Sequence, residues 1–160
     1  MPAAIVELEA LLPLLAPNVR LIGVDLGTKT IGLALSDTRR TIASPLETLK
    51  RTKFRPDAER LLAIAKLHDV GALVMGLPLN MDGSEGPRAQ STRAFARNFS
   101  RLTDLAIALW DERLSTAAVE RELIGMDMSR AKRAEVIDEH AAIFILQGAL
   151  DRLANLRRKS

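Results

Sequence analysis

The sequence has no cysteine and no tyrosine, and aromatic residues make up only 3% of its 160 positions. The lack of cysteine excludes a disulfide framework, a thiolate metal site and a cysteine nucleophile. The shortage of aromatic rings leaves few platforms on which single-stranded bases could stack. Any nucleic-acid binding would therefore rely on backbone charge and shape.

Long apolar runs are also absent, since none approaches the roughly 20 residues that cross a bilayer. The apolar N-terminal segment contains Glu7 and Glu9, and no basic residue precedes Arg20. A secretory signal requires a basic start and an uninterrupted apolar centre, so this segment does not fit one. We therefore expect a cytoplasmic protein with no membrane partner.

The residues that are present indicate one globular domain with a sizeable core. Hydrophobic residues make up 48% of the chain and charged residues 27%, which excludes a disordered class. The 23 basic and 20 acidic side chains leave a net charge of +3, which permits an anionic partner without requiring one. The positions of the charges therefore matter more than their sum.

Hydrophobic patterning predicts an α/β fold. Three successive apolar segments with short connections are typical of an antiparallel meander, and they cover residues 19–25, 31–36 and 41–49. Buried strands then alternate with helices, with strands at 72–75 and 105–110 and helices at 56–68, 87–102 and 136–153. This order predicts a central mixed five-stranded sheet with helices on both faces. We expect a helical appendage over residues 1–18, the main domain over 19–155 and a frayed basic tail over 156–160.

Three acidic residues lie where chemistry could occur. Asp25 ends an apolar strand, Glu112 follows another, and Asp138 opens the last helix. Taken singly, each has a structural explanation, because a turn carboxylate, a solvated ion pair and a helix-dipole partner are all common. Ala141 and Ala142 would let the face of that helix bearing Asp138 approach the sheet closely.

Taken together, the three acids suggest a metal site. The elements that carry them can converge on one edge of the sheet, where open α/β folds gather their ligands. Carboxylate oxygens of this kind suit Mg²⁺ or Mn²⁺. Divalent ions at such a site can activate water and stabilise the leaving oxygen in phosphodiester cleavage.

The helix predicted at 87–102 has no acidic residue. It carries four arginines, namely Arg88, Arg93, Arg97 and Arg101. The last three recur every four residues and form one stripe, opposite a core-facing stripe of Phe95, Phe99 and Leu102. Guanidinium groups match phosphate geometry, so the stripe is a candidate track for a nucleic-acid backbone. A solvated helix face is the alternative explanation.

Four segments in order carry a resemblance to a known family. They are GVDLGTKTIG at 23–32, GLPLNMDGSEGPRA at 76–89, DERLST at 111–116 and DEHAA at 138–142. Together they resemble the bacterial pre-16S ribosomal RNA nucleases, also described as Holliday junction resolvases. The similarity runs from about residue 19 to residue 150.

The resemblance implies an RNase H-like fold, a cytoplasmic location and a role in maturing the 5′ end of 16S rRNA. It also implies that Asp25, Glu112 and Asp138 form the acidic site. Related junction resolvases carry a fourth acid three residues after the last one, and Ala141 stands there in this chain. This departure from the wider superfamily bears on the strength of catalysis and not on the fold.

We expect a Mg²⁺- or Mn²⁺-dependent endonuclease acting on precursor 16S rRNA or a ribosomal precursor particle, as a monomer or weak homodimer. Lys29 and Arg113 would bind phosphate oxygens at the cleavage site. Arg88 and the arginine stripe would bind the phosphate backbone of the nucleic acid. Three alternatives stay open: a resolvase of branched DNA, a non-catalytic RNA-binding assembly factor, and an actin-like ATPase. The last ranks lowest, because 160 residues accommodate only one of the two lobes such enzymes use.

Overall fold

A computed structural model describes residues 5–114 and 130–159 of the chain, with side chains described for 5–114 and 140–158. At its centre is a six-stranded mixed sheet with the strand order β1-β6-β5-β2-β3-β4. Strands β2 (Arg20–Leu26), β3 (Thr30–Ser36) and β4 (Ala43–Lys50) form the antiparallel meander. The predicted α/β class, with its meander, is confirmed.

The rest of the chain extends the sheet through parallel pairs. Helix α1 (Phe54–Leu67) leads into β5 (Val70–Leu77), which pairs in parallel with β2. Helix α2 (Pro87–Ser100) leads into β6 (Ala106–Asp111), which pairs in parallel with β5. Helix α4 (Arg130–Lys159) closes the described chain.

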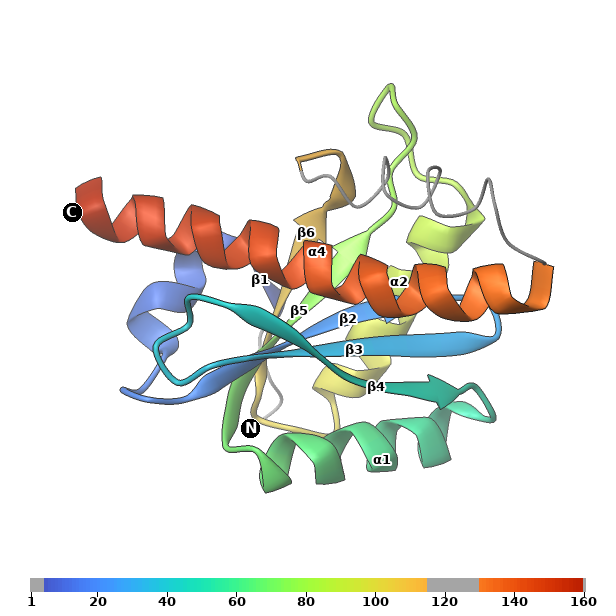
Figure 1. Ribbon diagram of the computed structural model, residues 1–160, viewed down its shortest axis with the longest axis horizontal. Helices are drawn as coiled ribbons and strands as arrows, with labels where there is room; N and C mark the ends of the chain where they lie inside the picture. The colour runs from blue at the N-terminus through green and yellow to red at the C-terminus, as the bar shows by residue number, and fades with distance from the viewer. Residues whose placement is uncertain (1–4, 115–129, 160) are drawn as a thin grey trace.

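Helices cover both faces of the sheet, as the sequence predicts (Figure 1). One face packs against α1 and α2 in a core that contains Leu61, Met75 and Phe99. The other face packs against α4 in a second core that contains Trp110 and Ile145. Because side chains alternate between the faces of a strand, each strand contributes to both cores.

The predicted count of five strands is wrong, because a two-residue strand β1 (Ile5–Val6) adds to the edge of β6. A 3₁₀ helix, η1 (Leu8–Leu14), follows it within the segment for which the sequence predicts a helical appendage. Leu8 and Leu11 of η1 are buried beneath α4 in the second core. Two residues are too few to show a strand periodicity, and their partner in β6 lies about a hundred positions away in the chain.

The expected frayed tail at 156–160 is also wrong as far as the described chain extends, because α4 continues to Lys159. Leu153 is buried and Leu156 is packed against the core, so apolar contacts hold this end of the helix to the fold. Within the residues described, none of the helices has both the length and the apolar character that a membrane span requires.

Close approach of α4 to the sheet depends on small residues, as expected from Ala141 and Ala142, which are both buried. Across from them on β2, a Cβ atom added to Gly23 would lie 2.9 Å from the carbonyl oxygen of Ala142. The middle of α4 therefore lies almost directly on β2, two residues before Asp25.

Candidate active site

Asp25 lies at the carboxyl end of β2, and its side chain is only 1% exposed. Leu21, four residues earlier in the same strand, belongs to the core beneath α4. The two-residue alternation of a strand therefore places the Asp25 carboxylate on the α4 face of the sheet. Arg88 at the start of α2 brings its Nη2 within 3.8 Å of the Asp25 Oδ1.

Glu112 begins the 3₁₀ helix η2 (Glu112–Leu114) directly after β6, and it is 3% exposed. Ala108 and Trp110, at alternating positions before it, belong to the core beneath α4. The same alternation directs Glu112 to the face on which Asp25 lies. A solvated ion pair, the structural explanation that the sequence offers for Glu112 taken alone, does not apply, because the residue is buried.

Gly76 on β5 separates the two carboxylates. The register pairs Val24 with Met75 and Gly76 with Trp110, so Gly76 lies beside Asp25 and two positions before the level of Glu112. A Cβ atom added to Gly76 would lie 3.3 Å from the Glu112 carboxyl carbon and would overlap Ile145 of α4. The missing side chain of Gly76 is what lets Glu112 and α4 share this space.

Asp138 lies within α4, but its side chain is outside the described residues. Its position precedes the buried Ala142 and Ile145 by four and seven residues, which is the spacing of one helix face. The convergence of Asp138 with the other two acids therefore stays a prediction.

A small hollow of about 140 Å³ lies beside Asp25 and is lined by residues that include Arg51, Arg88 and Ser91. Arg51 donates to the carbonyl oxygen of Gly27 over 2.8 Å, and Arg88 donates to that of Leu26 over 3.4 Å. These two guanidinium groups hold the turn that follows Asp25. Arg51 belongs to a second basic group in the sequence, at 39–55, but it is not among the predicted site residues, because nothing in its local pattern distinguishes it from its basic neighbours.

Lys29 is exposed on the same turn, between β2 and β3. Arg113 has a different environment from the one predicted. Its guanidinium binds the carboxylate of Asp111 at 2.7 Å and donates to the carbonyl of Met81 over 3.3 Å. The hydrogen bond from Arg113 lowers the pKa of Asp111. Arg113 thus ties the loop before α2 to the end of β6, and its predicted contact with phosphate stays a prediction.

The arginine stripe lies on the exposed face of α2, and Phe95 and Phe99 are buried on the opposite face as predicted. Arg93 differs from Arg97 and Arg101, because its Nε lies 2.7 Å from the Glu85 carboxylate. Glu85, which balances the charge of Arg93, precedes the helix. A count of charges within residues 87–102 therefore does not include it.

Asp25 and Glu112 fit a divalent ion by their chemistry. Burying an ionised carboxylate is costly unless a cation or hydrogen-bond donors offset the charge, and here two buried carboxylates stand at the ends of the strands that flank β5. No group of three metal-binding side chains occurs among the described side chains, from which Asp138 is missing. A complete ligand set would therefore require Asp138, water or the substrate.

Comparison with known proteins places this geometry in a family. The profile of the RuvX family, described as "Holliday junction resolvase", matches residues 19–152. The chain belongs to this family. The N-terminal segment that forms β1 and η1 lies outside the matched region, as the sequence analysis expected for residues 1–18.

Curated relatives match all or most of the chain. A protein of Nitrobacter hamburgensis named "Putative pre-16S rRNA nuclease" is 69% identical over 160 residues, covering 100% of this chain and 98% of its own. A Bradyrhizobium diazoefficiens protein of the same name is 74% identical over 137 residues, 86% of this chain and 85% of its own. The family and these relatives support a nuclease role for the chain.

Among solved structures, T. thermophilus RuvC in complex with a Holliday junction substrate aligns with a TM-score of 0.52 and 14% identity. The alignment covers 84% of this chain and 96% of that one. This likeness concerns the fold, and it confirms the RNase H-like architecture.

Proposed function

We propose that the chain is a divalent-metal-dependent endonuclease that cleaves structured RNA and matures the 5′ end of precursor 16S rRNA in the cytoplasm. The observation that carries the proposal is the pair of buried carboxylates, Asp25 and Glu112. They lie at the ends of the two strands that flank β5, on one face of the sheet. The printed name of the relatives supports RNA as the substrate.

Asp25 and Glu112 would hold Mg²⁺ or Mn²⁺, with Asp138 as the third ligand. When bound, such an ion supplies a Lewis acid that activates water and offsets charge on the phosphate. The neighbouring side chains of this protein would orient the substrate. Arg88, between Asp25 and the hollow beside it, is placed to hold a phosphate oxygen, and Lys29 is exposed on the adjoining turn.

Parallel cleavage assays on a precursor 16S rRNA fragment and a four-way DNA junction test the proposal. Wild-type protein with Mg²⁺ or Mn²⁺ should cut the RNA, and Asp25→Asn should be slower by more than about 100-fold because a metal ligand is lost. Glu59→Gln, an exposed acid on α1, should cut at the wild-type rate. If Asp25→Asn cuts RNA as fast as wild type, the assigned roles are wrong.

Branched DNA is the second candidate substrate, since the family's description names Holliday junction resolvases. Cleavage of the four-way junction in preference to RNA would favour it. A third outcome would identify a binding factor: tight, salt-dependent RNA binding that Asp25→Asn leaves intact, with no cleavage by wild type.

A further inference from the structure

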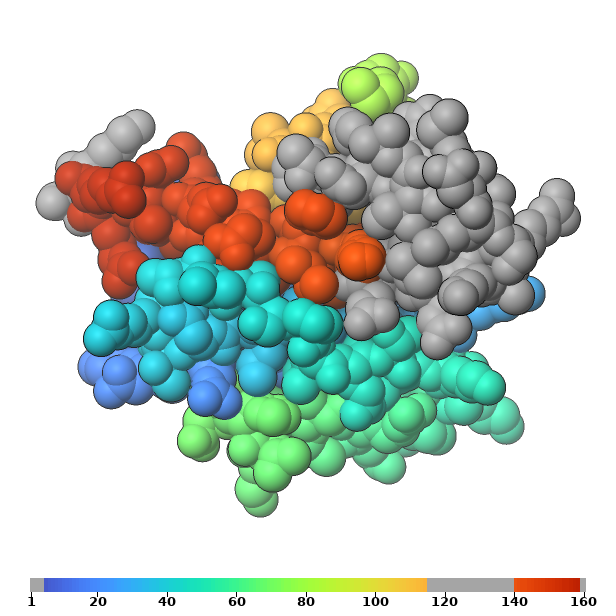
Figure 2. All heavy atoms as spheres, in the orientation of Figure 1, coloured from blue at the N-terminus to red at the C-terminus, as the bar shows by residue number. Residues whose placement is uncertain are grey.

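A groove of about 820 Å³ lies on the α4 face, between η1, the end of β6 and the second half of α4. Its floor is apolar and includes Leu8, Leu109, Trp110 and Phe144. Figure 2 shows the red surface of α4 and the gold surface at the end of β6, which border this hollow near the upper edge of the molecule. We call it the β6 groove.

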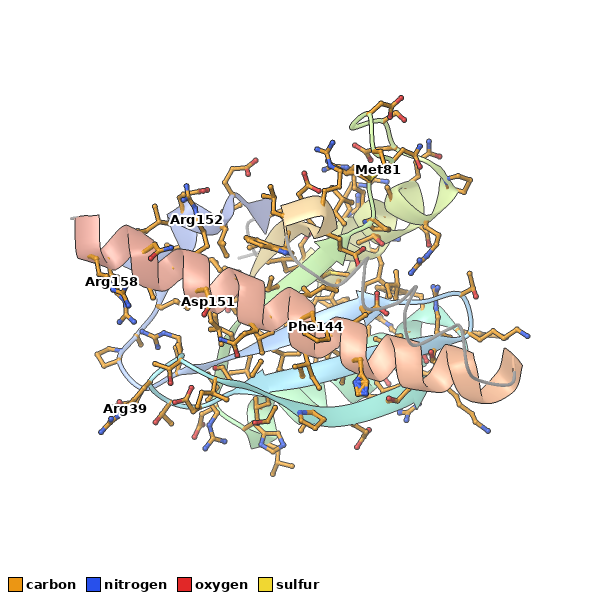
Figure 3. The ribbon with its side chains drawn as sticks, turned by 45° about the horizontal axis from the view of Figure 1, so that its top comes forward. Arg39, Met81, Phe144, Asp151, Arg152 and Arg158 are labelled. Carbon is orange, nitrogen blue, oxygen red and sulfur yellow. The ribbon has the colours of Figure 1, made fainter. Side chains whose placement is uncertain are left out.

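The rim of the β6 groove is acidic in a chain whose net charge is positive. Glu7, Glu9, Asp111 and Asp151 line it, with Arg152 as the basic member. Glu9 lies 3.8 Å from Arg152, and Arg113 pairs with Asp111. Glu7 and Asp151 are exposed, and neither forms an ion pair within the part of the chain that the structure describes. Figure 3 shows Phe144, Asp151 and Arg152 following one another along α4.

The groove is also lined by Trp110, whose indole N–H is a buried hydrogen-bond donor without an acceptor among the described residues. Trp110 is 6% exposed, and its Nε1 has no hydrogen-bond partner among the described residues. Trp110 shares the α4 face with Ala108 and lines the groove. A buried indole N–H without an acceptor is unfavourable, so a ligand carbonyl that reaches Nε1 when the ring shifts towards the groove would gain a hydrogen bond.

The groove follows an open edge of the sheet. Strand β1 pairs only with Ile107 and Ala108, the second and third residues of β6. Beyond them, Leu109–Asp111 line the groove, and no described strand pairs with their outer edge. Backbone groups along such an edge can hydrogen-bond an added strand, and side-chain pockets beside it give specificity.

We propose that the β6 groove binds an extended basic segment of a partner protein, which adds a short strand along Leu109–Asp111. The acidic rim complements lysine or arginine side chains, the floor accepts alternate apolar side chains, and the open edge accepts the peptide backbone. The same rim repels phosphates, so RNA is not expected to occupy the groove, although Asp111 at its end adjoins Glu112. The proposal does not depend on the nuclease assignment.

Trp110, the single tryptophan of the chain, is a built-in fluorescent reporter for the test. The probe is an eight-residue peptide of alternating lysine and valine. It should shift the Trp110 emission saturably, and its affinity should fall by at least about tenfold at high salt. A matched peptide with glutamate in place of lysine should produce no shift. A version with N-methylated valines should bind more weakly, because the valine N–H groups, which lie along one edge of the extended peptide, can no longer donate hydrogen bonds.

Charge-reversal variants locate the binding. The double variant Glu7→Lys with Asp151→Lys should weaken the basic peptide by at least about tenfold, since like charges then face each other. Glu59→Lys on α1 is the matched control and should bind as wild type does. Thermal unfolding and RNA cleavage should be unchanged in both proteins, which separates this test from that of the proposed function.

Three results of these assays would overturn the proposal. They are no emission shift with the basic peptide, an equal response to the glutamate peptide, and an equal loss of affinity in Glu59→Lys. Sedimentation at rising protein concentration tests whether a second copy of the chain binds in the groove. If wild type dimerises and the double variant does not, a second copy fills the groove and the proposal is wrong.

Discussion

Gly76 illustrates how much a single residue contributes to the site. It lies on β5, the strand between those that lead to Asp25 and Glu112, and its lack of a side chain leaves room for both Glu112 and Ile145. The sequence shows this glycine at the end of a strand, yet the reason for it appears only when α4, about seventy positions away, is in place.

Replacing Gly76 with alanine should destabilise the protein by about 1–3 kcal/mol and slow cleavage, because the new Cβ would displace Ile145 and press on Glu112. Adding Ile145→Val removes the overlapping methyl group and should recover part of the stability. Chemical denaturation and single-turnover cleavage measure the two effects. Gly86→Ala, whose new Cβ would lie 3.8 Å from Asn80, should be tolerated. Equal effects at both glycines would refute this account of Gly76.

Asp37, in the turn between β3 and β4, makes the stability of the fold depend on pH in the acid range. Its partial burial raises its pKa, but the N–H groups of Ile42 and Thr41 and the Thr41 hydroxyl bind the carboxylate and hold the pKa at about 2, below the ordinary 3.8. A lowered folded-state pKa stabilises the fold above pH 3.8, and this stabilisation is lost as the pH falls through 2.

Asp37→Asn should therefore lower the free energy of unfolding by about 1 kcal/mol near neutral pH, a value reduced to allow for solvent screening. The difference between wild type and variant should shrink as the pH falls from 4 towards 2. Urea unfolding over that pH range measures it. A difference that is constant with pH would show that the charge of Asp37 contributes nothing.

The elements that the sequence predicts best are those with long apolar periodicity. Helix α2 and strand β5 appear at the expected places, and Pro45 sits inside β4 where a shift in the strand register accommodates it. The short elements β1 and η1 were harder to predict, because their stability comes from contacts with β6 and α4 rather than from local pattern.

The first turn of helix α1 contains a buried carboxylate, that of Asp57, which the sequence analysis did not single out. Asp57 is 2% exposed, and it accepts hydrogen bonds from the backbone N–H of Thr52 at 3.0 Å and from the Thr52 hydroxyl at 2.7 Å. Asp57→Ala should lower the free energy of unfolding by about 1 kcal/mol, since the partly buried N–H and hydroxyl of Thr52 lose their acceptor. Thr52→Val, which keeps the backbone N–H, should cost less. Chemical denaturation compares them, and a neutral Asp57→Ala would contradict this role.

Helix α2 should act as a track for the nucleic-acid backbone. Arg97→Gln and Arg101→Gln should each reduce the slope of log affinity against log salt by roughly 0.7–0.9, the contribution of one phosphate contact. Arg93→Gln should have a smaller effect, because Glu85 already pairs with Arg93. Filter binding of RNA at several salt concentrations measures the slope. Arg158→Gln, at the far end of α4, is the control, and an equal change there would point to nonspecific charge.

At the scale of the whole molecule, the fold separates two kinds of surface. Asp25, Glu112 and the basic start of α2 lie at the carboxyl ends of the parallel strands, and the acidic β6 groove lies at the sheet edge below α4. The sequence predicts that the elements carrying Asp25 and Glu112 can converge on one edge of the sheet, because both acids stand at the ends of apolar strands, but the face on which each side chain lies comes from the packing of α4. The groove could not, because it forms only where η1, β6 and α4 meet.

The central claim is that Asp25 and Glu112, with Asp138, hold a divalent ion. Calorimetric titration with Mn²⁺ of the wild-type protein and of Asp25→Asn, Glu112→Gln and Asp138→Asn tests it most directly, with circular dichroism to confirm that each variant folds. We predict that wild type binds Mn²⁺ and that each variant binds at least about tenfold more weakly. Folded variants that bind Mn²⁺ as tightly as wild type would contradict the claim.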